Sequence, residues 1–75
     1  METNEGAISA TARKIKLELV DQNLSRNALA TRAGIPATSF TRKLDRPEQF
    51  TLKDLGSIAQ ALEIKLADLF KDAAA

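Results

Sequence analysis

The chain of 75 residues contains no cysteine and no histidine. Without cysteine there are no disulfides and no thiolate metal ligands, as is usual for proteins of the cytoplasm, where we expect this protein to act. Without histidine as well, a zinc site, an imidazole base and an ordinary catalytic triad are excluded. The carboxylates that remain are scattered along the sequence, so we expect neither an enzyme nor a bound cofactor or metal.

Long apolar runs are also absent. No stretch approaches the ~20 residues that a membrane-spanning helix needs, and residues 1–6 are polar and acidic, unlike a signal peptide. We therefore expect no contact with a membrane. The composition, 44% hydrophobic and 28% charged, is typical of a globular protein. The length suits one small domain, either a complete short protein or a part of a longer regulator, and association of copies would help to stabilise so small a core.

The hydrophobic pattern predicts a first helix over residues 7–20. Its apolar residues recur at steps of four and three, which places them on one face: Ile8, Ala12, Ile15 and Leu19. Three cations lie off this face, and they either contact a phosphate or form an ordinary solvated surface: Arg13, Lys14 and Lys16. Asn23 is able to end the helix in the left-handed conformation.

Two short helices joined by a tight turn are predicted next, over residues 25–44. Ser25 is a good N-cap for the first helix, and Gly34 can take the left-handed conformation that ends it. Pro36 has a fixed φ that suits the start of the second helix. Small Ala30 allows the two helices to cross closely, and the apolar residues between them are Leu29, Ala33, Ile35 and Phe40. This arrangement is typical of a helix-turn-helix that binds DNA.

Two further helices follow. After an exposed loop at residues 45–49, Thr51 and Asp54 have the spacing of a capping box at the start of a helix. The core face of this helix is expected to contain Leu52, Leu55, Ile58, Ala59 and Leu62. Gly56 within it indicates either the close approach of another helix or a tolerated weakness of about 1 kcal/mol. A last short helix contains Leu66, Leu69 and Phe70, with Asp68 in its first turn.

Apolar pairs five residues apart support four of the predicted helix starts. Such pairs can pack as hydrophobic staples: Leu24 with Leu29, Ile35 with Phe40, Phe50 with Leu55, and Ile64 with Leu69. The sequence therefore predicts an all-α, compact five-helix domain over residues 7–70, with flexible ends at residues 1–6 and 71–75.

Positive charge is concentrated on the predicted helix-turn-helix. The whole chain has a net charge of only +1, whereas residues 22–46 carry five Lys or Arg residues and one Asp. The segments on either side have net charges of −1 and −2. A nearly neutral protein with its cations gathered on one segment fits a small DNA-binding domain.

The second helix of the pair has side chains suited to recognising bases. If it runs from about residue 36 or 37 to residue 44, Phe40 and Leu44 face inward, and the outward residues are Ala37, Thr38, Thr41 and Arg42. Arg42 could donate two hydrogen bonds to a guanine, and a threonine could bond a base edge or contact a thymine methyl group. Ser39 contacts either the DNA or the local backbone.

The ordered set of residues resembles a known family, the lambda-repressor-like (Cro/C1, or XRE) helix-turn-helix proteins of phages and bacteria. The resemblance covers residues 8–70 and depends on Leu24-Ser25, Leu29-Ala30, Gly34-Ile35, Phe40, Arg42 and Leu69-Phe70. It implies a recognition helix in the major groove of double-stranded DNA and a transcriptional regulator, most often a repressor. The family usually has Gln in place of Arg26, Ser or Thr in place of Pro36, and an apolar residue in place of Lys43.

Further cations are candidates for contacts with the DNA backbone. The resemblance implies such a contact for Arg26, in the first turn of its helix, where a cation opposes the helix dipole. For the others a plain solvated charge is an equal alternative: Arg32, Lys43 and Arg46.

One recognition helix contacts few base pairs, so we expect a homodimer on a palindromic operator with half-sites about 34 Å apart. Its interface would contain Leu66, Leu69 and Phe70, or part of the fourth helix, unless these residues simply close the core. An antitoxin-like protein-interaction module on the same fold is the alternative function.

Overall fold

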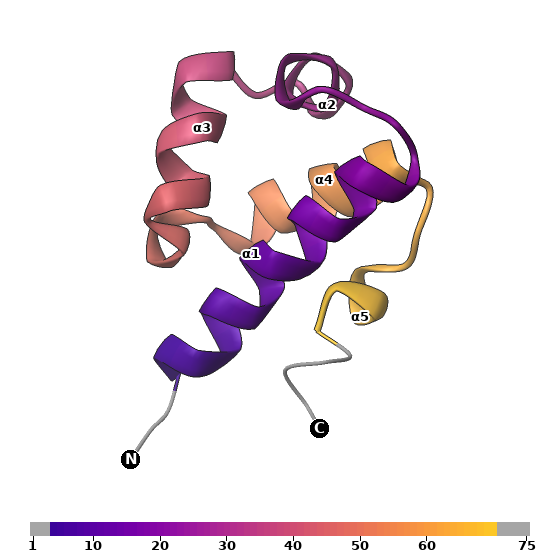
Figure 1. Cartoon of the computed structure of the whole chain (residues 1–75). Coiled ribbons are helices and arrows are strands. Elements are labelled where there is room, and N and C mark those ends of the chain that lie inside the picture. The colour runs from indigo at the N-terminus through magenta and orange to yellow at the C-terminus, as the bar shows by residue number, and fades with distance from the viewer. Residues whose placement is uncertain (1–3, 71–75) are drawn as a thin grey trace.

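All five predicted helices form in the computed structural model, which describes the backbone of residues 4–70 and the side chains of residues 9–70. The elements are α1 (Asn4–Asp21), α2 (Arg26–Ala33), α3 (Ala37–Asp45), the 3₁₀ helix η1 (Pro47–Gln49), α4 (Leu52–Leu62) and α5 (Leu66–Leu69). Residues 1–3 and 71–75, where flexible ends are predicted, lie outside the described part. The all-α, five-helix architecture is confirmed (Figure 1).

Helix α1 runs along one side of the molecule and buries the predicted face. Ala12, Ile15 and Leu19 are buried, whereas the side chain of Ile8 lies outside the described residues. The helix begins at Asn4, so residues 4–6 are helical and the prediction that they are loose is wrong. After it ends, Asn23 has a φ of 55°, as predicted.

The turn between α2 and α3 has the predicted geometry. The Ser25 hydroxyl accepts a hydrogen bond from the Ala28 backbone N–H at 3.0 Å and so caps α2. Gly34 has a φ of 72° and ends the helix in the left-handed conformation. The N–H of the next residue, Ile35, donates to the Ala30 carbonyl at 2.9 Å, and Pro36 precedes the first turn of α3. The bend between α2 and α3 therefore results from the conformations and hydrogen bonds of a few neighbouring residues.

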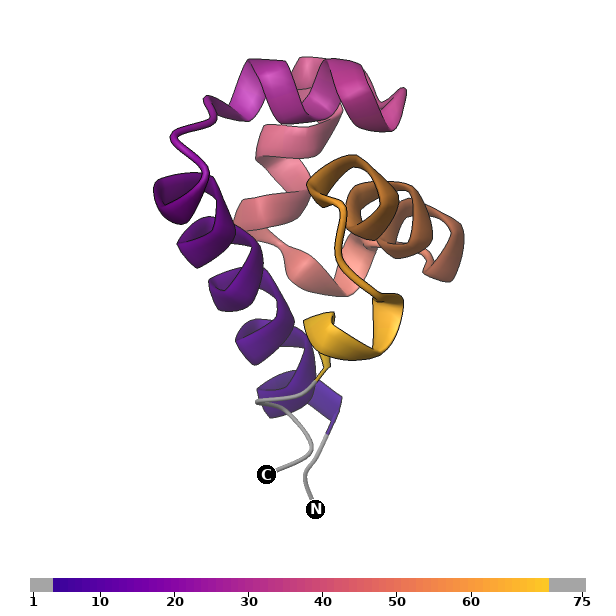
Figure 2. The same cartoon turned by 90° about the vertical axis from the view of Figure 1, so that its right-hand side faces the viewer.

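A single core lies between the helices. Its largest fully buried side chains come from every α-helix: Phe40, Ile15, Leu29, Leu44, Ile58, Leu62 and Leu69. Phe40 also meets Phe50 edge to face, with ring centroids 6.3 Å apart. Helix α2 packs against α3 and α4, while α1 packs against η1 and α5. As a result α3 lies at the outside of the molecule, with one face on the core and the other free (Figures 1 and 2).

Two expectations need correction. Leu52 is 69% exposed and is not part of the core, because it is the first residue of α4 and points away from the other helices. The predicted loop at residues 45–49 is shorter and more regular, since Asp45 ends α3 and Pro47 starts η1. The fixed φ of proline suits such a first helical position.

The structure decides between the two alternatives for Gly56. A Cβ atom at this position would meet nothing within 4 Å, so no helix approaches closely and the glycine is a tolerated weakness.

The alternatives for the last helix are also decided in part. Leu69 is fully buried within the single chain, so it closes the core and is not available to a second copy. Leu66 and Phe70 are half-buried, and Leu66 packs against the same core.

Candidate nucleic-acid interface

The outer face of α3 follows from how its inner face is anchored. Phe40 and Leu44, four residues apart, are 0% and 2% exposed and hold the helix on the core. The residues on the other face of the helix therefore point outward. Ala37, Thr38 and Arg42 are exposed, and Thr41 is half-buried.

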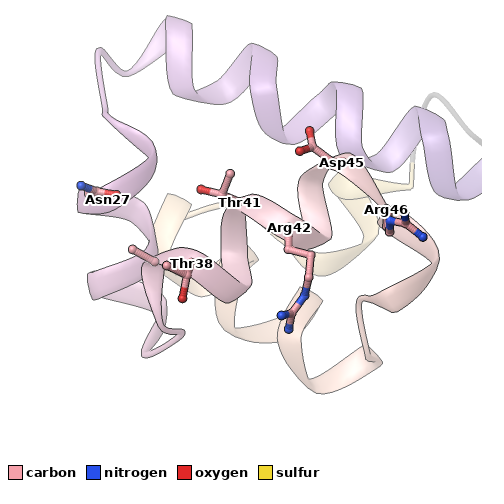
Figure 3. A pocket seen from close by; sticks show the side chains of 7 residues that line it. Asn27, Thr38, Thr41, Arg42, Asp45 and Arg46 are labelled. Carbon is pink, nitrogen blue, oxygen red and sulfur yellow. The ribbon is translucent and has the colours of Figure 1, made fainter.

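These four residues line one open hollow of about 570 Å³ (Figure 3). Its remaining lining comes from Asn27, Asp45 and Arg46. The sequence therefore predicted which residues of α3 share a surface. Whether they contact bases stays a prediction.

Asn27 and Asp45 were missed by the sequence reasoning. Asn27 lies in the first turn of α2, and its amide carries two donors and an acceptor at the edge of the hollow. Its position directly after Arg26 is a sequence signal that could have found it. Asp45, the last residue of α3, adds a carboxylate to the same surface. In Figure 3 its side chain points toward α1, whereas Arg42 points to the opposite side.

The residues predicted to contact the DNA backbone lie at different distances from the hollow. Arg46 lines the hollow, and Arg26 is exposed in the first turn of α2, next to Asn27. Arg32 is exposed in the last turn of α2 and does not line the hollow. Ser39 is half-buried and lies outside the hollow as well. The arrangement favours Arg26 and Arg46 over the other two for contacts beside the outer face of α3.

Lys43 is engaged elsewhere. Its Nζ lies 2.6 Å from Asp54 Oδ2, and the two side chains are only 19% and 16% exposed. The same Asp54 oxygen accepts a hydrogen bond from the Thr51 N–H at 3.1 Å, and the Thr51 hydroxyl accepts one from the Asp54 N–H at 3.0 Å, which completes the predicted capping box. Lys43 therefore joins α3 to the start of α4, and this contact explains its place better than a phosphate contact does.

The ion pair also affects the ionisation of Asp54. Partial burial by itself would raise the pKa of this carboxyl, but the hydrogen bonds from Lys43 and from the Thr51 backbone outweigh it and hold the pKa below its usual value. The carboxylate is thus charged over the whole range in which the protein would meet DNA.

The cations of α1 fall into two kinds. Lys14 Nζ lies 3.3 Å from Glu18 Oε2, one turn along the helix, and its side chain is 28% exposed. Arg13 and Lys16 are exposed. A solvated, ion-paired face therefore describes Lys14, while the alternative stays open for the other two.

Sites of other kinds do not stand out. Within residues 4–70 the structure has no group of three His, Cys, Asp or Glu residues that could hold a metal ion. No helix in that range is both long and apolar enough to cross a membrane.

Comparison with known proteins identifies the family. A family model described as the Cro/C1-type HTH DNA-binding domain matches residues 14–74, which include the whole of the hollow on α3. No curated protein and no solved structure matches the chain. The match covers most of the sequence and is consistent with the all-α, five-helix fold. The chain belongs to the Cro/C1-type helix-turn-helix family of DNA-binding domains.

Proposed function

We propose that this protein recognises a specific double-stranded DNA sequence with α3 in the major groove and regulates transcription, as a phage or bacterial repressor in the cytoplasm. The observation that carries the proposal is the outer face of α3, where Ala37, Thr38, Thr41 and Arg42 line one hollow. The major groove is about 12 Å wide and accepts a helix, and each base pair there presents its own pattern of donors and acceptors. Membership in the family supports the same role.

Each side chain on this face has a defined chemical task. The exposed guanidinium of Arg42 donates two parallel hydrogen bonds to O6 and N7 of a guanine. Thr38 and Thr41 offer a hydroxyl to a base edge or a methyl group to thymine, and Ala37 is small enough for the start of α3 to approach the bases.

Contacts with the DNA backbone orient this face. The first turn of α2 presents backbone N–H groups and the side chains of Arg26 and Asn27, which together suit a phosphate. Arg46, at the other end of the hollow, supplies a second cation. Such contacts hold the protein in register and do not depend on base sequence.

Two copies on one operator complete the proposal. A helix of nine residues contacts too few base pairs to select one site in a genome, whereas two copies related by a two-fold axis read half-sites about 34 Å apart. The operator is then a palindrome.

Selection of bound sequences from a pool of random duplexes tests this function. We expect a palindromic site with a spacing of about one helical turn between half-sites. A pool that shows no enrichment, together with no shift of a random duplex at low salt, would contradict DNA recognition and favour a protein-interaction module.

A further inference from the structure

A second hollow lies beside the first, between α1 and the end of α3. Ser9, Arg13 and Lys16 are spaced four and three residues apart, so they share one face of α1, and all three are exposed. With Leu44, Asp45 and Pro47 they line an open hollow of about 340 Å³.

The two hollows adjoin at a single residue. Asp45 lines both of them, one on each side of the C-terminal end of α3. Figure 3 shows the Asp45 side chain, at the end of α3, directed toward α1. The exposed face of α1 therefore flanks the surface that is proposed to contact bases.

The geometry of DNA indicates what this second hollow would face if α3 lies in the major groove. A helix that lies in the major groove has a phosphate backbone along each flank. Because this hollow lies between α1 and the C-terminal end of α3, the phosphate backbone on that side passes close to Arg13 and Lys16. We propose that Arg13 and Lys16 form a phosphate-binding site, which holds one strand of the duplex in addition to the contacts at the first turn of α2. The inference rests on the proposed function, because it requires α3 to lie in the groove.

The charges of the hollow agree with this ligand. Arg13 and Lys16 outnumber the one carboxylate among the lining residues, that of Asp45, and Ser9 adds a hydroxyl donor. Asp45 repels the same phosphates, so it limits how tightly the site binds. Lys14 differs from its neighbours because Glu18 already neutralises it, and it lines neither hollow.

The salt dependence of DNA binding tests the site, since each phosphate contact adds about 0.9 to the slope of log K against log salt. We would compare the wild type with Arg13→Ala/Lys16→Ala and with Lys14→Ala, using a random-sequence duplex and the selected operator. The double variant should reduce the magnitude of this negative slope by roughly 1.8 and weaken binding to both duplexes equally. Lys14→Ala should leave the slope unchanged, and circular dichroism checks that all three proteins fold.

Asp45→Asn supplies a test of opposite sign. Removing the carboxylate should tighten binding to the random duplex severalfold, because a repulsion with phosphate is lost. If the wild type binds the operator but the double variant keeps its slope, or if Lys14→Ala loses as much, the phosphate site is wrong and the proposed function stands. If the wild type binds no duplex, the proposed function itself fails and takes the site with it.

Discussion

Arg42 is the residue at which base recognition and general attachment to DNA can be separated. Its guanidinium is exposed on the outer face of α3, while Phe40 and Leu44 hold the helix from the other side. We expect Arg42→Ala to cost about 1–3 kcal/mol of binding free energy on the operator and to relax the preference at one base pair. Titration of the operator and a random duplex measures this. Lys53→Ala, an exposed cation on α4, is the control, and an equal loss on both duplexes would remove Arg42 from base recognition.

Arg26 should behave in the opposite way. It lies in the first turn of α2, where its charge opposes the helix dipole, so its replacement should leave the fold intact or slightly more stable. Arg26→Ala should weaken binding to all sequences alike and lower the salt slope by about 1. Salt titrations on both duplexes, with thermal unfolding alongside, measure these effects. A loss confined to the operator would contradict a backbone contact.

Single positions show where prediction from sequence succeeds and where it fails. The inward and outward residues of α3 follow from the helical repeat, and the structure places them as predicted. Lys43 and Leu52 do not follow, because neither the charge of Lys43 nor the helical repeat that includes Leu52 shows which other helix lies beside the residue. The one is held by Asp54 and the other is 69% exposed.

At the scale of the elements, the bend between α2 and α3 depends on the conformation of one glycine. A Cβ atom at Gly34 or at Gly56 would meet nothing within 4 Å, so the two positions differ in backbone conformation and not in space. Gly34 has a φ of 72°, where a side chain costs about 1–2 kcal/mol. Gly56 lies inside α4, where alanine is favoured by about 1 kcal/mol.

We therefore expect Gly34→Ala to destabilise the protein and Gly56→Ala to stabilise it, each by roughly 1 kcal/mol, or about 4–8 °C in the midpoint of thermal unfolding. Urea and thermal unfolding of the two variants measure the changes. Shifts of the same sign would show that backbone conformation is not what distinguishes the two positions.

The ion pair between α3 and α4 is the other feature of element scale. A double-mutant cycle with Lys43→Met and Asp54→Asn should give a coupling of about 1 kcal/mol at neutral pH, since both side chains keep some contact with water. Because Asp54 has a lowered pKa in the folded state, the stability it contributes is present above its unfolded value of 3.8.

That contribution is lost as the pH falls below 3.8 and through the lower folded pKa. Urea unfolding from neutral pH down to about pH 2 should show the difference between the wild type and Asp54→Asn shrinking in this range. A difference that stays constant would mean that the charge of Asp54 does not stabilise the junction. The pair also fixes the end of α3, so a break in it should weaken operator binding beyond the loss of stability.

For the whole molecule, the main prediction concerns whether two copies associate in solution or only on DNA. Leu69 is fully buried and Leu66 and Phe70 are half-buried, so only part of the apolar surface around α5 remains for a partner. We therefore expect a monomer in sedimentation at micromolar protein without DNA, and two copies on one palindromic duplex. A stable dimer without DNA would show that another surface holds the copies together. A single copy on the full palindrome would contradict the two-fold arrangement.

The amino-acid sequence by itself determined the helices, their caps and the glycine turn, because each depends on residues within about five positions of one another. The outer face of α3 follows from the same short-range repeat. Only the tertiary structure decided that Lys43 meets Asp54, that Leu69 closes the core, and that Arg13 and Lys16 lie beside the end of α3. These relations join residues whose helices come together through packing, and a local pattern carries no information on the distance between two such helices.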